Sequence, residues 1–262
     1  MSYTFVAQTD RGRVRANNED SVDFDPVSGL AVLADGMGGY KAGEVASALA
    51  TGHIKAELSR WLQASGQTVN VRHIRQAAQS CVANANALIL ASARANPEHV
   101  GMGTTLVVAI FCGPQLILGH VGDSRCYRLR DGVLQQLTRD HSVLQEQIDA
   151  GLLTPAQAAQ SSDRNLVTRA LGVENAAHLE LNDFPVQADD LYLLCSDGLT
   201  DMVQDAGIAA ILRQRTTLDQ MARDLVQMAN QNGGRDNIAV VLVRASEAKR
   251  PRHFLARLLG RS

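Results

Sequence analysis

The alternation of short apolar runs with longer amphipathic stretches predicts a chain of mixed strands and helices. Residues 3–9, 22–24 and 30–34 form apolar or alternating runs of strand length. Two longer stretches, 43–62 and 71–95, repeat Ala, Leu, Ile and Val at helical spacing. They predict two consecutive helices.

The middle of the chain is typical of strands joined by tight turns. Four runs follow one another with only a few residues between them, at 103–111, 115–121, 124–130 and 133–137. Asp131 and Gly132 separate the last two runs, and this dipeptide is typical of a two-residue hairpin turn. The spacing predicts an antiparallel meander.

An irregular segment, residues 142–172, follows the meander and suits a surface flap, because two short helical patterns precede a polar stretch. Arg164 and Arg169 within it are candidates to face a substrate, although exposed arginines ordinarily have no specific role. The remaining pattern predicts strands at 179–184, 190–195 and 238–244, and helices at 207–214 and 218–231.

These elements fill residues 1–245 without a linker, which predicts one domain. Residues 246–262 form a basic tail with interspersed leucines. The tail is consistent with an amphipathic helix that docks on a partner or an anionic surface, but its composition is more typical of a frayed or self-docked C-terminal tail.

Composition narrows the class of protein. The chain has 262 residues, is 45% hydrophobic and 20% charged, and carries a net charge of −2, which gives no indication of a nucleic-acid partner. No signal peptide is evident, and no apolar run approaches the roughly 20 residues that span a bilayer. Four cysteines without a CxxC pair are typical of free thiols in a reducing cytoplasm, so a cytoplasmic location is expected.

Four carboxylates lie beside strands that are expected to be buried. Asp35 follows the run 30–34 and precedes a glycine-rich loop, where an ion or ligand can approach the backbone closely. Similar cases are Asp123 after 116–121, Asp197 after 191–195, and Asp236 with Asn237 before 238–243. Carboxylates gathered at strand ends repel one another unless a positive charge lies between them, and a hard divalent cation would supply it. Taken singly, each Asp-Gly pair is equally consistent with an ordinary turn.

Residues 10–21 form a polar segment dense in charge. One interpretation is a solvated loop between two strands. The other is that Asp20 joins the carboxylate cluster and that Arg15 supplies a guanidinium fork for a phosphate.

Seven motifs occur in order along the chain: RVRANNED, ADGMGGYKAGEVAS, GTT, HVGDSRCYRLR, LTRDHS, CSDGLTD and GGRDNIAVVLV. Together they resemble the PPM (PP2C) family of metal-dependent protein serine/threonine phosphatases, and most of all its compact bacterial members that oppose eukaryote-like Ser/Thr kinases. The resemblance covers residues 3 to 244. It implies an α+β fold, a four-layer α/β/β/α sandwich in which helices flank two central antiparallel sheets.

The resemblance also implies two bridged Mn²⁺ or Mg²⁺ ions at one end of the sandwich. Asp35 should bridge both ions, and Gly36 should offer its backbone carbonyl to one of them. Asp197 and Asp236 should bind the ion nearer them, with Asn237 supporting the metal site.

Further roles follow from the same resemblance. Asp20 should act as an outer ligand or through water, and Arg15 should bind the substrate phosphate. A third, weaker ion is expected at Asp123, together with Asp197. Met37 occupies the position where animal members have a histidine that is thought to protonate the leaving group. Met37 cannot donate a proton, so we expect a metal-bound water near Asp123 to do so.

The expected activity is hydrolysis of phosphoserine and phosphothreonine in proteins by a metal-bridging hydroxide, because two divalent ions lower the pKa of a bridging water and stabilise the attacking and leaving oxygens. All-oxygen ligands favour Mn²⁺ or Mg²⁺ over zinc. The expected partners are phosphorylated proteins, including a cognate Ser/Thr kinase and its substrates, such as a forkhead-associated-domain protein. A monomer is the default expectation.

Two alternatives remain open at this point. One is a catalytically weak phosphopeptide-binding module on the same fold, which a missing aspartate ligand would favour, although every candidate ligand is present. The other is a phosphatase for small phosphoesters.

Overall fold

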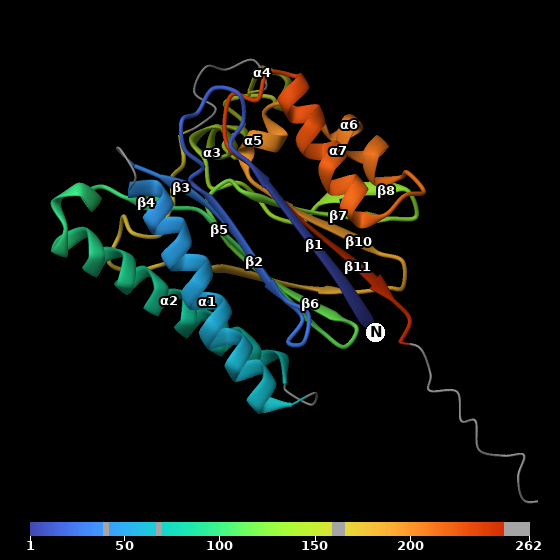
Figure 1. Ribbon diagram of the computed structural model, residues 1–262, viewed down its shortest axis with the longest axis horizontal. Helices are drawn as coiled ribbons and strands as arrows, with labels where there is room; N and C mark the ends of the chain where they lie inside the picture. The colour runs from blue at the N-terminus through green and yellow to red at the C-terminus, as the bar shows by residue number, and fades with distance from the viewer. Residues whose placement is uncertain (39–41, 67–69, 159–165, 249–262) are drawn as a thin grey trace, which may run out of the picture.

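Two antiparallel sheets lie face to face at the centre of the molecule, and helices cover both outer faces (Figure 1). The computed structural model describes residues 1–38, 42–66, 70–158 and 166–248. The first sheet has the order β1 (Ser2–Asp10), β11 (Ile238–Ser246), β10 (Leu191–Cys195), β7 (Arg125–Arg130) and β8 (Val133–Gln136). The second has the order β2 (Asp20–Asp25), β3 (Leu30–Met37), β5 (Leu106–Cys112), β6 (Gln115–Val121) and β9 (Glu180–Pro185), and the short β4 (Gly103–Thr104) pairs with β3.

The helices are divided between the two faces. The long antiparallel helices α1 (Ala42–Ser65) and α2 (Val71–Ala95) pack on the second sheet, and α6 (Asp205–Leu212) and α7 (Leu218–Gln231) cover the first. The shorter helical segments are η1 (Pro97–His99), α3 (Val143–Asp149), α4 (Pro155–Ala158) and α5 (Asp197–Thr200). The predicted four-layer α/β/β/α sandwich is confirmed.

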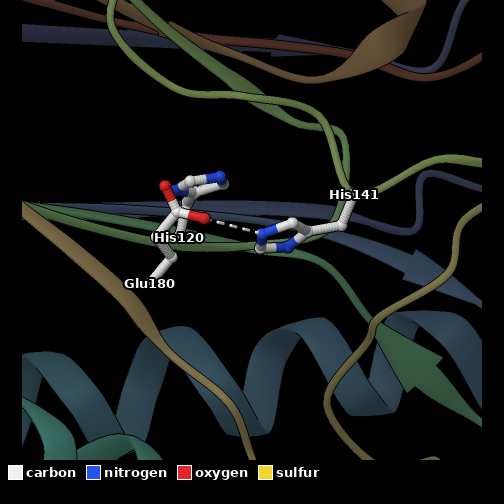
Figure 2. A group of neighbouring side chains, drawn as sticks. All are labelled: His120, His141 and Glu180. Atoms are coloured by element: carbon white, nitrogen blue, oxygen red, sulfur yellow. Dashed lines mark hydrogen bonds and ion pairs between the residues drawn. The ribbon is translucent and has the colours of Figure 1, made fainter. Parts of the chain in front are cut away.

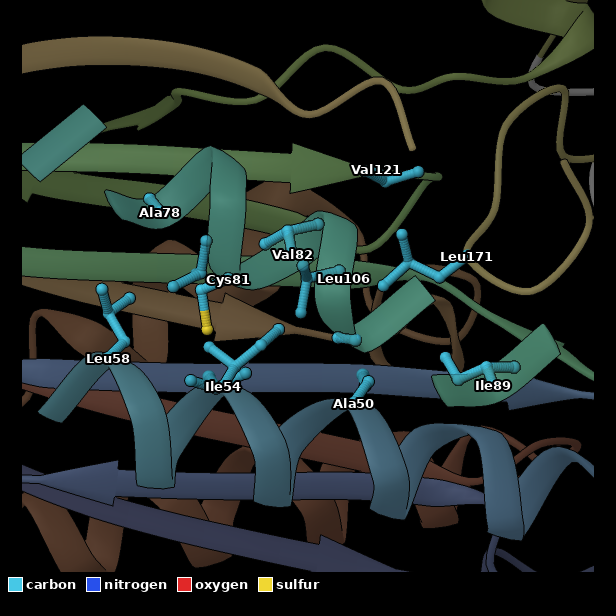
Figure 3. Close-up of a cluster of buried hydrophobic side chains, with 14 of the residues drawn as sticks. Ala50, Ile54, Leu58, Ala78, Cys81, Val82, Ile89, Leu106, Val121 and Leu171 are labelled. Atoms are coloured by element: carbon cyan, nitrogen blue, oxygen red, sulfur yellow. The ribbon is translucent and has the colours of Figure 1, made fainter. Parts of the chain in front are cut away.

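Strand β3 illustrates why the central strands have continuous apolar runs. Successive side chains of a strand point to opposite faces, and both faces of β3 are covered. Leu30, Val32 and Ala34 pack under α1 and α2, whereas Ala31 and Leu33 face the other sheet. Figure 3 shows the outer layer of this core, in which Ile54 of α1 packs near Cys81 and Val82 of α2.

The predicted four-strand meander is wrong in one respect. β6 and β7 are consecutive in the chain but belong to different sheets, since β6 pairs with β5 and β9, and β7 pairs with β8 and β10. The chain crosses between the sheets at Gly122, whose φ of +100° turns the backbone away from its own strand. The hairpin at Asp131 and Gly132 is confirmed, with Arg130 paired to Val133 and positive φ at both turn residues.

Three further differences concern the ends of elements. β3 does not stop at Ala34 but continues to Met37, because Gly36 and Met37 pair with β4. The predicted strand at 103–111 is divided into β4 and β5. The one-turn helix α5 was not predicted, because four residues carry no periodicity.

The structure also bears on the tail, the flap and the cysteines. Arg164 and residues 249–262, most of the predicted tail, lie outside the described residues. Cys81, Cys112, Cys126 and Cys195 carry free thiols, as expected. Among the residues described, no helix is long and apolar enough to cross a membrane.

Candidate active site

Asp20 and Asp35 lie opposite each other in the β2–β3 pair, at one end of the second sheet. The backbone around Asp35 is held on its other side by two threonines. The Asp35 N–H donates to Thr105 Oγ1 at 3.0 Å, and the Asp35 carbonyl accepts from Thr104 Oγ1 and from the Thr105 N–H, each at 2.9 Å. The carboxylate at the end of β3 therefore has a fixed backbone.

Asp197 enters the site from the other sheet. It is the first residue of α5, directly after β10. The preceding Ser196 joins the two sheets, because its hydroxyl donates to Asp20 Oδ2 at 2.8 Å and accepts from the Ala239 N–H at 2.9 Å. Asp20 Oδ1 is buried without a hydrogen-bond partner among the described residues.

Asp236 and Asn237 lie just before β11 and organise the charged loop near the N-terminus. Asp236 Oδ2 accepts from Arg15 Nη2 at 2.6 Å, and the Arg15 side chain is 54% exposed. Asn237 Oδ1 accepts from the Glu19 N–H at 2.8 Å, and its Nδ2 donates to the carbonyls of Arg11 and Asn17. These hydrogen bonds and the ion pair attach the loop that carries Arg15 to the start of β11.

Asp123 lies in the turn between the sheets and is 8% exposed. Its neighbour Ser124 shares a hydrogen bond of 2.8 Å with Thr105, the residue that also holds Asp35. Thr105 thus links the crossing turn to the end of β3.

Burial and the charges of neighbouring carboxylates raise the pKa values of Asp20, Asp35, Asp123 and Asp197. The pKa of Asp35 is well above its usual value because of burial and then the charge of Asp20, and that of Asp197 because of burial and then the charge of Asp123. Burial raises the pKa of Asp20 to about 7 and that of Asp123 to about 6. Such a group of carboxylates is stable in ionised form only beside a cation.

The donor set fits a hard divalent cation. Every candidate ligand is an oxygen, and the unpartnered Asp20 Oδ1 is available for a metal-bound water or a direct contact. Gly36 lies where a side chain is impossible, since a Cβ would be 2.1 Å from the carbonyl oxygen of Gly43. The predicted residues Asp20, Asp35, Gly36, Asp123, Asp197, Asp236, Asn237 and Arg15 therefore meet at one end of the sandwich.

A small cavity of about 100 Å³ lies next to the aspartates, between Met37 and residues 167–170 near the end of the flap. Arg169 is one of its lining residues. A larger cavity of about 560 Å³ is lined by Gly29 and so lies at the other end of β3. The carboxylates, not the larger of these two cavities, define the candidate site.

The sequence did not predict several residues that hold the candidate site in place. Thr105 and Ser196 act through hydrogen bonds to residues far away in the chain, and the motifs GTT and CSDG were their only signal. The Glu19 carbonyl accepts from the Gly36 N–H at 3.1 Å and from Ser47 Oγ at 2.6 Å, so Glu19 joins the site loop to α1.

Fold and carboxylate group together define a metal-dependent phosphatase. The model of the protein phosphatase 2C family matches residues 8–243, and the chain belongs to this family. The serine/threonine phosphatase stp of Listeria innocua is 38% identical over 242 residues, which cover 90% of this chain and 93% of that protein.

Solved structures agree with this assignment. The serine/threonine phosphatase PstP/Ppp of Mycobacterium tuberculosis superposes with a TM-score of 0.86 at 40% identity, covering 94% of this chain and 100% of that chain. The catalytic domain of PstP in complex with two manganese ions has a TM-score of 0.82 at 39% identity, covering 94% of this chain and 99% of that one. The predicted enzyme class, a protein serine/threonine phosphatase that depends on Mn²⁺ or Mg²⁺, is therefore confirmed.

Proposed function

We propose that this phosphatase removes phosphate from phosphoserine and phosphothreonine with two divalent cations held by Asp35, the Gly36 carbonyl, Asp197 and Asp236. The single observation that carries this proposal is that aspartates from both sheets gather at one end of the sandwich. Asp35 lies opposite Asp20, and Asp20 accepts a hydrogen bond from Ser196, the residue before Asp197. When bound, the cations would lower the pKa of water and neutralise phosphate charge, which is the chemistry that phosphate-ester hydrolysis needs.

Arg15 has two successive roles in this proposal. Its guanidinium is the counter-ion of Asp236 in the described structure. With a cation beside Asp236, Arg15 is free to bind two phosphate oxygens and to stabilise the charge that develops on them. Its half-exposed position lets it reach a phosphoamino acid on the surface of another protein.

Asp123 is proposed to hold a third, weaker cation together with Asp197. The pKa of each is raised, with burial as the first cause, and the charge of Asp123 is the second cause for Asp197. Since Met37 has no proton to give, a water ordered near Asp123 is the proposed proton donor to the leaving serine or threonine oxygen.

The proposed substrates are proteins phosphorylated by a bacterial Ser/Thr kinase, including the kinase itself and forkhead-associated-domain proteins. The names of the relatives support phosphorylated proteins as substrates, and the kinase and its targets are proposed from the resemblance of the seven ordered motifs alone. A kcat/KM that is far higher for a phosphothreonine protein than for p-nitrophenyl phosphate is expected. The reverse order would favour a phosphatase for small phosphoesters.

Calorimetric titration of Mn²⁺ tests the proposed ligands. Wild-type protein should bind two ions tightly and one weakly. Asp197→Asn should weaken both the tight binding and the weak site, because Asp197 is a proposed ligand in each, whereas Asp123→Asn should remove only the weak site. Retention of both tight sites with unchanged affinity in Asp197→Asn would overturn the assignment.

A further inference from the structure

The turn that carries Asp123 is held by a histidine that none of the roles above uses. We infer that His141 is a positioning residue, which fixes the Gly122–Asp123 turn and ties it to the base of the flap. The inference rests on the proposed role of Asp123 as a ligand of the weak third cation. By fixing this turn, His141 would set the affinity of the third cation site.

His141 makes hydrogen bonds to both backbone polar groups of Gly122. The His141 N–H donates to the Gly122 carbonyl at 3.0 Å, and the Gly122 N–H donates to His141 Nδ1 at 3.1 Å. Both backbone polar groups of the residue before Asp123 are thus satisfied by one distant residue. His141 is 7% exposed, so water does not readily replace these bonds.

Gly122 needs this support because its conformation is unusual. Its φ is +100°, and a Cβ at this position would lie 2.8 Å from the side chain of Thr105. A glycine at the crossing point loses much conformational entropy on folding, and strand pairing does not continue through it. External hydrogen bonds therefore have to define the direction in which Asp123 leaves the turn.

The hydrogen bonds also fix the protonation of His141. A backbone N–H can only donate, so Nδ1 must accept, and in the neutral ring the proton lies on Nε2. That N–H faces Glu180 Oε2 at 3.2 Å. Burial lowers the pKa of His141, which keeps this neutral tautomer. Glu180 thereby orients the ring that holds Gly122.

Figure 2 shows His120 beside the same pair. Its ring stacks on that of His141, with centroids 4.6 Å apart and planes 13° apart, and its Nε2 lies 2.7 Å from the Arg139 carbonyl. Potential ligand atoms of His120, His141 and Glu180 all lie within 4.8 Å of one another.

This cluster is nevertheless poorly arranged for a cation. The Nε2 of His141 carries a proton, because Nδ1 is occupied by the Gly122 N–H. In addition, the in-plane lone pairs of nearly parallel stacked rings do not converge on one point. A positioning role uses every hydrogen bond that the structure gives His141, whereas metal binding would break the one to Gly122.

The backbone of His141 extends the connection to the flap. Its carbonyl accepts from the Thr168 N–H at 2.8 Å, and the next residue, Ser142, forms a β-bridge with Val167. Further along, Leu171 exchanges two backbone hydrogen bonds with Thr104, the residue that also contacts Asp35. The two ends of the flap are thus attached to the turn of Asp123 and to the backbone near Asp35.

Calorimetric titration with Mn²⁺ alone tests the inference, because it does not depend on turnover. His141→Ala should weaken the weakest Mn²⁺ site by roughly 10–100-fold, the usual effect of losing a residue that orients a ligand. The two tight sites should be unchanged. His141→Asn places an acceptor near the position of Nδ1 and should restore most of the affinity. His73→Ala, which changes an exposed histidine of α2, is the matched control.

Amide hydrogen exchange provides a second measurement, which reports on the Gly122–Asp123 turn itself. The Gly122 amide should exchange with solvent slowly in the wild type and in His141→Asn, and rapidly in His141→Ala. If His141→Ala does not fold, Glu180→Ala provides the test at a side chain that is 38% exposed, with a smaller effect in the same direction.

Two results would overturn the inference. Unchanged affinity of the weakest Mn²⁺ site in His141→Ala would refute it and leave the proposed third site intact. Absence of a weak site in the wild type would refute the third site and this inference together, while the two tight sites and the phosphatase assignment would stand.

Discussion

Asp20 and Asp35 are direct cross-strand neighbours on β2 and β3, so two acidic side chains occupy adjoining positions at a buried sheet end. Like charges directly opposite each other destabilise a sheet. The surrounding hydrogen bonds from Thr104, Thr105 and Ser196 nevertheless hold both residues in place. We expect this end of the sandwich to be less stable without a cation, as the proposed cation site requires.

Removing one of these carboxylates should therefore stabilise the metal-free protein. Asp35→Asn keeps the shape of the side chain but cannot carry a negative charge beside Asp20 and Asp197. We expect a gain of about 0.5–2 kcal/mol in the free energy of unfolding in EDTA at pH 8. Urea denaturation measures this, with Asp183→Asn on the edge strand β9 as a control that loses only a surface ion pair with Arg75. A loss of stability in Asp35→Asn would contradict the account.

The raised pKa of Asp20 makes one contribution to the pH dependence of stability in the metal-free protein. An ordinary aspartate has a pKa near 3.9 when unfolded, and burial raises that of Asp20 to about 7. Between these two values the folded state holds a proton on Asp20 that the unfolded state has lost. The contribution of this proton to the free energy of unfolding is complete below about pH 4 and is lost as the pH rises through about 7.

The raised pKa values of Asp35, Asp123 and Asp197 act in the same direction, and the lowered pKa of His141 acts in the opposite one, so the measurement compares two proteins. Wild type and Asp20→Asn share this histidine. The stability of Asp20→Asn relative to wild type, measured by thermal denaturation in EDTA, should increase from pH 5 to pH 8. A constant difference across this range would show that the Asp20 carboxyl does not titrate there.

Arg15 should affect substrate binding more than metal binding. Arg15→Ala removes the proposed phosphate fork and is expected to lower kcat/KM by about 10²–10³-fold. The affinity for Mn²⁺ should stay the same or rise, because Arg15 competes for Asp236. Arg13→Ala, in the same loop, is the control. A weaker Mn²⁺ affinity in Arg15→Ala would place Arg15 among the residues that support the metal site instead.

Asn237 should be essential for the loop that carries Arg15. Its side chain makes hydrogen bonds to three backbone groups, of Arg11, Asn17 and Glu19, and it is 6% exposed. Asn237→Ala leaves these groups unpaired and should cost about 2–3 kcal/mol in urea denaturation. Asn232→Ala, which removes one exposed hydrogen bond, should cost less than about 1 kcal/mol. Equal costs for the two substitutions would be inconsistent with this role.

The sequence predicts those features that depend on local pattern. Helix α2 begins and ends where its amphipathic spacing does, and the turn at Asp131 and Gly132 is determined by the residues that form it. The aspartates were identifiable because each lies at an end of a run that is apolar enough to be a buried strand, although they come from both sheets.

Long-range relationships could not be predicted in this way. The change of sheet at Gly122 resembles a hairpin in the sequence, and only the packing against Thr105 distinguishes the two. The hydrogen bonds that Ser196 and His141 make to distant segments also leave no periodic signal. The ordered motifs predicted the residues of the candidate site, but not the contacts that hold them in position.

The most direct test of the central claim is dephosphorylation of a phosphothreonine peptide in EDTA, Mg²⁺ or Mn²⁺ by wild type, Asp35→Asn and Asp197→Asn. The account predicts activity in wild type only with Mn²⁺ or Mg²⁺, and at least about 10³-fold lower activity in both folded variants, because each loses a proposed cation ligand. Activity of the wild type in EDTA, or full activity of Asp35→Asn with Mn²⁺, would contradict the proposed two-cation site.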